Sequence, residues 1–294
     1  MSWLAIALFA QFLLAIAVLV DRHIVVRAAH IGRPIVYTFY TSVLSGTVLV
    51  LAPFVSIPSS GIFFLSLLSG GAFASALYFL YSALRVARAS DAAPVIGAIS
   101  ALTTLALAWV FVVGDISPHA VPAVLLLVAG TVLISHFHFR RHALLFSLLA
   151  GLAFGVAVFI AKLVDIDIGF LDGFFWTRFL NFALVLGLLA VPALRRAILH
   201  GGTHSTHRAK ALVVGNKVIS SSASVLTAYA ISLGSVSVVN ALSGVQFAIL
   251  FVFSFLFAGL MPKADDPLTH GHGGWRTALG VALIALGLAT LFLT

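Results

Sequence analysis

The sequence contains no cysteine and no glutamate, and it has few charged residues of any kind. The absence of cysteine excludes disulfides and thiolate metal sites, and it leaves the redox compartment undefined. All eight acidic residues are therefore aspartates. Charged residues make up 8% of the 294 residues and hydrophobic residues 62%, a balance far from that of a soluble domain. Such a chain is suited to a lipid bilayer.

The formal net charge of +8 does not indicate a nucleic-acid partner. In so apolar a chain, the favoured partner for the basic residues is the anionic inner face of a membrane. The N-terminal segment MSWLAIALFAQFLLAIAVLV has neither a basic region before its apolar run nor a small-residue cleavage site. We therefore expect it to be a retained membrane span and not a cleaved signal.

Ten segments are long and apolar enough to be expected as membrane-spanning helices, which satisfy their own backbone in lipid. They are Ser2–Val20, Pro34–Phe54, Ile62–Leu84, Ala92–Val113, Val121–His136, Leu144–Val164, Phe170–Pro192, Ala211–Ser232, Val236–Leu260 and Trp275–Leu293. No connection between them is long enough for a soluble domain. The sequence thus predicts an all-α polytopic membrane protein with ten transmembrane helices.

The positive charges predict the orientation, because Lys and Arg in short loops stay on the cytoplasmic side. Thirteen of the sixteen basic residues fall in the odd-numbered loops: Arg22, Arg27, Arg33, Arg85, Arg88, Arg140, Arg141, Arg195, Arg196, Arg208, Lys210, Lys263 and Arg276. This places both termini on the extracytoplasmic side of a plasma (inner) membrane.

The two halves of the chain resemble each other. A shift of 140 residues lays Ala10–Ile24 on Ala150–Val164, with Arg22 over Lys162. Later in the chain, at a shift of 147 residues, ALRVARAS from Ala83 falls on AISLGSVS from Ala230. Five spans per half is an odd number, so the second copy enters the membrane from the opposite side. The sequence predicts two inverted five-helix repeats, residues 1–142 and 143–294, an arrangement typical of alternating-access transporters.

With these motifs the chain resembles the EamA-type transporters of the drug/metabolite transporter superfamily. The stretches that carry the resemblance are Ala83–Ser100, Gly114–Asp115, Val124–Ser135, Ala230–Phe247 and Thr277–Leu291. The resemblance covers nearly the whole chain. It implies a central cavity between the repeats and small-molecule substrates such as amino acids and other small metabolites, which are often exported.

Arg178 is the most unusual candidate, because an arginine near the middle of a span costs about 2.5–3.5 kcal/mol on insertion scales. It lies within the aromatic run FFWTRFLNF. One interpretation is a cation that faces a cavity and binds a substrate carboxylate, with Asn181 on the same helical face and Trp176 beside it. The alternatives are snorkelling to a boundary or a structural pair with Asp172 or a backbone carbonyl.

Lys217 begins a polar stripe of Ser220, Ser221, Ser224 and Thr227 at helical spacing. A stripe of this kind suits a water-lined wall. It is equally explained by hydroxyls that bond their own helix while Lys217 snorkels to the cytoplasmic surface.

Four further polar residues are candidate substrate contacts. Asn240 and Gln246 lie in the ninth span, where an unpaired amide is costly, so they contact either substrate or another helix. Tyr40 and Tyr78, in the second and third spans, suit a cavity wall or interfacial anchoring.

The sequence gives only weak indications of a coupling ion or a cofactor. A buried Asp21 or Asp115 suggests proton coupling, although a salt bridge at a helix end explains either residue. Histidines gather in three loops, at His136–His142, His200–His207 and His270–His272, but none has the spacing of a closed metal site. We expect no cofactor, and no nucleotide-binding loop or nucleophile motif indicates an ATP-driven pump or an enzyme.

The sequence therefore predicts a secondary transporter, and not an enzyme, that moves a small polar or amphipathic metabolite such as an amino acid or other carboxylate by alternating access, in the direction of export. Two alternatives stay open: a cation or metal carrier, and a non-transporting membrane scaffold.

Overall fold

A computed structural model describes residues 2–27, 33–87, 89–111, 120–134, 141–203, 207–256 and 274–293. Every regular element in these ranges is a helix, so the predicted all-α class is confirmed for the described residues. The elements are α1 (Ser2–Arg27), α2 (Pro34–Leu44), η1 (Ser45–Phe54), α3 (Ser60–Val86), α4 (Ala89–Phe111), α5 (Ala120–Ile134), α6 (Arg141–Ile168), α7 (Phe170–Gly187), η2 (Leu188–Ala190), α8 (Pro192–Thr203), α9 (His207–Leu233), α10 (Val236–Ala241), α11 (Ser243–Leu256) and α12 (Gly274–Leu293).

Seven helical segments are long and apolar enough to cross a membrane. They are Trp3–Val26, Pro34–Phe54, Ser60–Val86, Asp91–Phe111, Arg141–Ile168, Phe170–Ala190 and Lys210–Leu233. Shorter apolar helices occupy Val121–Leu133, Val236–Ile249 and Ala278–Thr290. Helix therefore overlaps all ten predicted segments, and the chain has the character of a helical multi-span membrane protein.

Three details depart from the expected segments. The predicted second span changes from α2 into the 3₁₀ helix η1, and the ninth is interrupted at Leu242, between α10 and α11. The amphipathic helix α8 covers residues 192–203, of which residues 193–203 were expected to be part of a basic loop. Its Ile198 is fully buried in a small core with Phe39 and Val185. The apolar positions of this loop were too few to predict a span, but they suffice for one buried helical face.

Local sequence explains several helix ends. Pro34 opens α2, where its missing N–H and fixed φ are favourable. The side chains of Ser59 and Ser235 accept hydrogen bonds from the N–H groups of Ile62 and Val238 and so cap α3 and α10. Gly169 joins α6 to α7 with a φ of 81°, a conformation that favours glycine.

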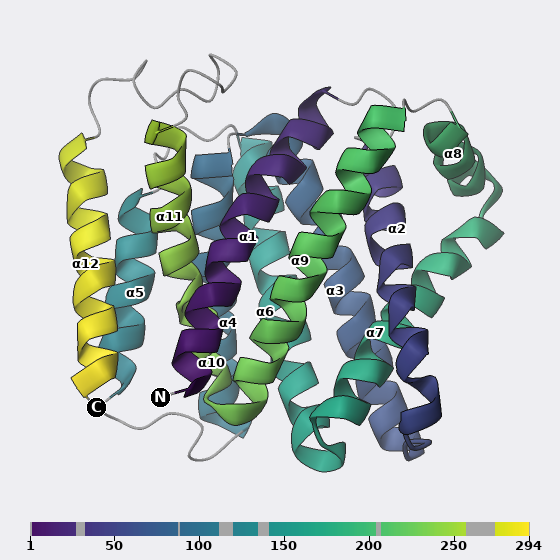
Figure 1. Cartoon of the computed structure of the whole chain (residues 1–294), viewed down its shortest axis with the longest axis horizontal. Helices are drawn as coiled ribbons and strands as arrows, with labels where there is room; N and C mark the ends of the chain where they lie inside the picture. Colours follow the sequence, from purple (N-terminus) through teal and green to yellow (C-terminus); the bar gives the residue numbers. More distant parts are fainter. Residues whose placement is uncertain are drawn as a thin grey trace.

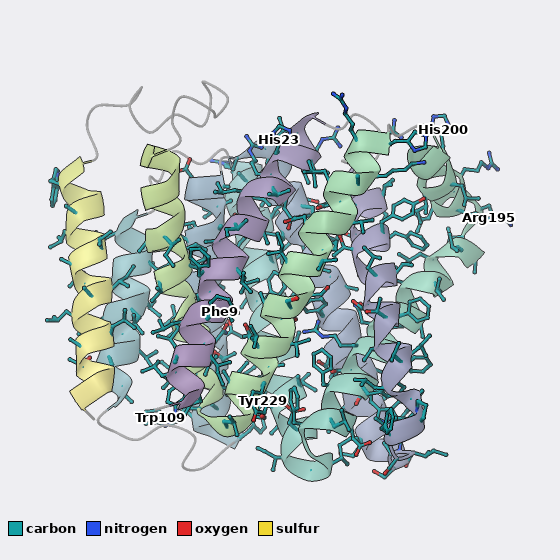
Figure 2. All side chains as sticks on the ribbon, viewed as in Figure 1. Phe9, His23, Trp109, Arg195, His200 and Tyr229 are labelled. Carbon is teal, nitrogen blue, oxygen red and sulfur yellow. The ribbon has the colours of Figure 1, made fainter. Side chains whose placement is uncertain are left out.

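The helices run side by side in one bundle (Figure 1). α1 packs against α9, α3 against α6, and α5 against α12, which forms one edge, while α8 lies at the opposite edge (Figure 1). Both termini lie at the lower end of the bundle (Figure 1). His23 and His200 lie at the upper end, and Trp109 and Tyr229 lie toward the lower end (Figure 2).

Glycines allow the closest helix contacts. A Cβ on Gly151 would lie 2.6 Å from Ile99, and one on Gly155 would lie 2.5 Å from Thr103. The GLAFG motif therefore packs α6 directly onto α4, as a pair of small residues four apart permits. At the α5–α12 contact, a Cβ on Gly130 would lie 2.6 Å from the carbonyl oxygen of Gly280.

Two buried apolar clusters occupy different levels of the bundle. Along α1, Leu4 and Ala7 belong to one cluster, and Ile24 and Val25 belong to the other. Along α9, Val213 belongs to the second cluster and Ala230 to the first. The middle of both helices lies between these two layers.

Candidate functional site

A cavity of about 540 Å³ lies in the bundle between the two apolar layers. On α1 it is lined from Gln11 to Asp21, between the cluster residues named above. Its walls come from α1, α2, η1, α3 and α4 in the first half of the chain and from α6, α7, α9, α10 and α11 in the second. The volume is within the range of small-molecule sites, about 300–1,000 Å³.

The predicted candidates divide into two groups. Six of the ten line this cavity: Arg178, Lys217, Ser221, Ser224, Asn240 and Gln246. The polar stripe of α9 faces it throughout, since Ser220 and Thr227 also line it.

Arg178 is half-buried in the cavity wall. Its Nη2 donates a hydrogen bond to Oγ of Ser224, 2.7 Å away. Its guanidinium lies over the ring of Phe73 at 4.3 Å and near that of Phe174 at 5.5 Å. Asp172, its expected structural partner, instead accepts a hydrogen bond from the backbone N–H of Ser56 at 2.7 Å.

Within the described residues Arg178 forms no ion pair with any carboxylate. Aromatic faces stabilise part of its charge. One hydroxyl accepts from a group that carries five N–H donors. The remaining donors are available to an anionic ligand in the cavity.

Lys217 does not snorkel to the surface, because only 4% of it is exposed. Its Nζ lies 2.8 Å from Oδ1 of Asp21 on α1 and 3.2 Å from the hydroxyl of Tyr81. Asp21 also accepts hydrogen bonds from the Tyr37 hydroxyl and from Nδ2 of Asn216. The charge of Lys217 is therefore neutralised inside a buried network that joins four helices.

Asn240 and Gln246 line the cavity from α10 and α11. Nδ2 of Asn240 also donates to the hydroxyls of Ser100 and Thr104, at 3.0 and 3.1 Å, so it joins α10 to α4. Asn240 therefore both contacts another helix and lines the cavity, so the two interpretations of this residue do not exclude each other.

The other four candidates do not line this cavity. Asn181 is fully buried, and its Nδ2 donates to the carbonyl of Gly70 on α3 at 3.0 Å. Asn181 and Arg178 are three residues apart on α7, but this spacing does not bring both side chains to the cavity. Arg178 contacts Ser224 on α9, whereas Asn181 contacts Gly70 on α3.

Trp176, Tyr40 and Tyr78 lie elsewhere for similar reasons. Trp176 donates from Nε1 to the carbonyl of Ser56 at 2.8 Å, at the connection between η1 and α3. The hydroxyl of Tyr40 lies 3.3 Å from the carbonyl oxygen of Ile198 and so contacts α8. Tyr78 is exposed on the outside of α3. None of these three side chains lines the cavity, and their role as substrate contacts stays a prediction.

Asp165 and Gln11 are among the cavity residues that the sequence analysis did not select. Asp165 lines the cavity from α6, and Gln11, only 2% exposed, lines it from α1. The buried Oε1 of Gln11 has no hydrogen-bond partner among the described residues. Both were recognisable as polar residues within apolar helices, and Phe154, Val158 and Ala161 place Asp165 on one helical face.

The proposed coupling and metal residues are only partly described. Asp21 is paired as above, whereas Asp115, His136, His138 and the His270–His272 segment lie outside the described residues. Within the described ranges, no three His or Asp side chains gather as a metal site would require.

Two basic residues make corresponding contacts in the two halves. Nη1 of Arg22 on α1 donates to the carbonyl of Leu84 near the end of α3. Nζ of Lys162 on α6 donates to the carbonyls of Ile231, at 2.7 Å, and Gly234, at 3.1 Å, near the end of α9. In the sequence alignment of the halves, Arg22 matches Lys162 and Leu84 matches Ile231.

No protein-family model and no curated protein matches the sequence. The fold is similar to that of a solved crystal structure, described only as that of a protein, with a TM-score of 0.60 and 18% sequence identity. The similarity covers 98% of this chain and 94% of the other. The chain thus shares a known fold over nearly its whole length. Fold and cavity together define a helical multi-span membrane protein whose largely apolar cavity carries a few polar and charged side chains.

Proposed function

We propose that the protein is a secondary transporter that moves a small polar or amphipathic metabolite bearing a carboxylate across the membrane by alternating access. The observation that carries the proposal is Arg178, a cation without a carboxylate partner among the described residues, in a cavity lined by both halves of the chain. Within a membrane such a residue is a default functional candidate. The cavity size suits a small molecule.

The position of the cavity supports alternating access. Packed apolar layers lie on both sides of it along α1 and α9. Opening one layer while the other stays closed would expose the cavity to one side of the membrane at a time. A scaffold has no need of a cavity that holds an arginine without a carboxylate partner among the described residues.

The corresponding contacts of Arg22 and Lys162 support the proposed inverted repeat of two five-helix units. α1 ascends from the N-terminus toward the end marked by His23, and α9 ends near Tyr229 at the other end, so the two contacts lie toward opposite ends (Figures 1 and 2). Two inverted units are what a ten-span, EamA-type architecture in the drug/metabolite transporter superfamily requires.

We further propose that the protein lies in the plasma (inner) membrane with both termini outside. The shared position of the termini supports an even number of crossings, and the basic loops favour the opposite, His23 and His200, end as the cytoplasmic one (Figures 1 and 2). The direction of export is an expectation from the family resemblance alone.

The proposal is tested by ligand-induced stabilisation in detergent, followed by flux from proteoliposomes loaded with each stabilising compound. A library of small carboxylates should contain members that raise the Tm of the native protein, because a ligand that binds only the folded state stabilises it. Arg178→Gln should lose this shift, whereas Arg195→Gln on the exposed face of α8 should retain it.

Stabilising compounds should leave native proteoliposomes faster than empty ones, and slowly through Arg178→Gln. A carboxylate shift that persists in folded Arg178→Gln, or binding without any flux, contradicts the proposed site or the proposed transport, respectively.

A further inference from the structure

A second charged residue of the cavity, Asp165, is not explained by the recognition of an anion. Asp165 is half-buried and lines the cavity from α6, next to the wall that Arg178 forms on α7. The Asp165 carboxylate lies against α7, the helix of Arg178, because a Cβ on Gly173 would overlap its Oδ1, and both side chains line the cavity. Within the described residues they nevertheless form no ion pair, and no hydrogen bond to the Asp165 carboxylate is found. A carboxylate in this position repels a simple anion bound at Arg178.

The remaining charges near the cavity are already compensated. Lys217 is paired with Asp21 at 2.8 Å. Lys162, the other cation near Asp165, directs its Nζ to the carbonyls of Ile231 and Gly234. These carbonyls lie at the C-terminal end of α9, where the helix dipole favours a positive charge. Arg178 and Asp165 are thus left as one positive and one negative group that face the same space.

The rest of this part of the cavity is apolar. Phe73 and Phe174 flank the guanidinium of Arg178. Phe154, Val158 and Ala161 form the cavity face of α6 that leads to Asp165. A ligand here meets two opposite charges set among apolar side chains.

We propose that Arg178 and Asp165 form a bipolar site for a zwitterion with an apolar body, Arg178 binding its carboxylate and Asp165 its ammonium group. This inference rests on the proposed function and specifies the substrate class of the same cavity. Both charges of such a ligand find an opposite charge in a site of low polarity, where an unpaired charge is unfavourable. The neutral sum of charges also avoids placing a net charge in the membrane.

The experiment compares three forms of each of several apolar α-amino acids: the free zwitterion, its N-acetyl derivative and its methyl ester. The first carries both charges, the second only the negative charge and the third only the positive charge. Binding is measured by calorimetry and by thermal shift on the full-length protein in detergent, so that it does not depend on flux. At least one free amino acid should bind about tenfold or more tightly than both of its derivatives.

Two variants separate the charges. Asp165→Asn should lose the preference for the zwitterion over the N-acetyl form, because the ammonium no longer meets a carboxylate. Arg178→Gln should lose the preference over the methyl ester. Asp167→Asn, a matched change at an exposed position of α6 outside the cavity, should retain both preferences.

Gly173 on α7 provides a variant that keeps both charges. A Cβ at this position would overlap Oδ1 of Asp165, so Gly173→Ala must displace the carboxylate. Its zwitterion preference should fall, whereas Gly187→Ala on the same helix, with open space around its Cβ, should behave as native.

The outcomes distinguish this inference from the proposal on which it rests. N-acetyl derivatives that bind the native protein as tightly as the free amino acids would overturn the bipolar site but leave an anion-binding transporter. An equal loss of all three forms in folded Asp165→Asn would also overturn the ammonium role. Absence of binding by every compound would remove the bipolar site, and a parallel failure of the carboxylate library would remove the proposed function too.

Discussion

Lys217 on α9 and Asp21 on α1 form an ion pair in which Nζ lies 2.8 Å from Oδ1 and both side chains are less than a tenth exposed. Asp21 belongs to the first half of the chain and Lys217 to the second, so the ion pair links α1 to α9 beside the cavity. Tyr37, Tyr81 and Asn216 supply the further hydrogen bonds that a buried pair needs.

Removing one member of this pair should destabilise the protein strongly. Asp21→Asn leaves the ammonium of Lys217 buried without a counter-charge, a loss of about 3–5 kcal/mol for buried pairs. The expected result is a clear fall in Tm, measured by intrinsic fluorescence in detergent. The double variant Asp21→Asn, Lys217→Met should recover much of the loss, and a double variant no more stable than Asp21→Asn would contradict the buried-pair interpretation.

The absence of cysteine makes the cavity wall directly measurable. Single cysteines at Ser221 and Ser224 should react with a small hydrophilic maleimide, because both positions line the cavity. Cysteine at Ser222 is the matched control, since this exposed position on the same helix does not line the cavity. In a lipid bilayer it should stay unlabelled. Equal labelling at all three positions, or at none, would remove the water-filled wall and favour the scaffold alternative.

Gly70 should be needed for packing and not for ligand recognition. A Cβ there would lie 2.6 Å from the backbone nitrogen of Asn181, whereas the nearest atom to a Cβ on Gly71 is 3.5 Å away. Gly70→Ala should therefore destabilise the α3–α7 contact by about 1–3 kcal/mol, as overpacked cores do. Gly71→Ala should have little effect on Tm. A Gly70→Ala protein with native Tm but altered ligand preference would place Asn181 back among the binding residues.

The contacts of Arg22 and Lys162 should influence opposite sides of the transport cycle. Arg22→Gln weakens the hydrogen bond to α3, and Lys162→Gln weakens those to α9. If the two contacts hold opposite ends closed, cavity cysteines should become more reactive from the cytoplasmic side in the first variant and from the outside in the second. Reactivity in sealed vesicles of known orientation measures this difference. The same direction of change in both variants would contradict the inverted-repeat proposal.

The amino-acid pattern was sufficient for several parts of the fold. Apolar runs bounded by charged and turn residues predicted ten helical segments, and a helix overlaps each of them. The prediction is possible because a backbone in lipid has few alternatives to a helix. The polar stripe on α9 was also predicted from the sequence, because helical spacing alone places Ser221 and Ser224 on one face. The helix α8 was missed because a short amphipathic helix lacks the long apolar run of a span.

The pairing of charges was decided by the tertiary structure. The sequence showed that Arg178 and Lys217 were costly in a membrane, but both had the same local appearance. Only the packing of α1 against α9 brings Asp21 to Lys217, across nearly two hundred residues, and leaves Arg178 with Ser224 and the ring of Phe73. In the same way, only the placement of α7 beside α6 brings Asp165 and Arg178 to the same cavity. Helical periodicity fixes which side chains share a face, whereas only the arrangement of the helices determines what that face meets.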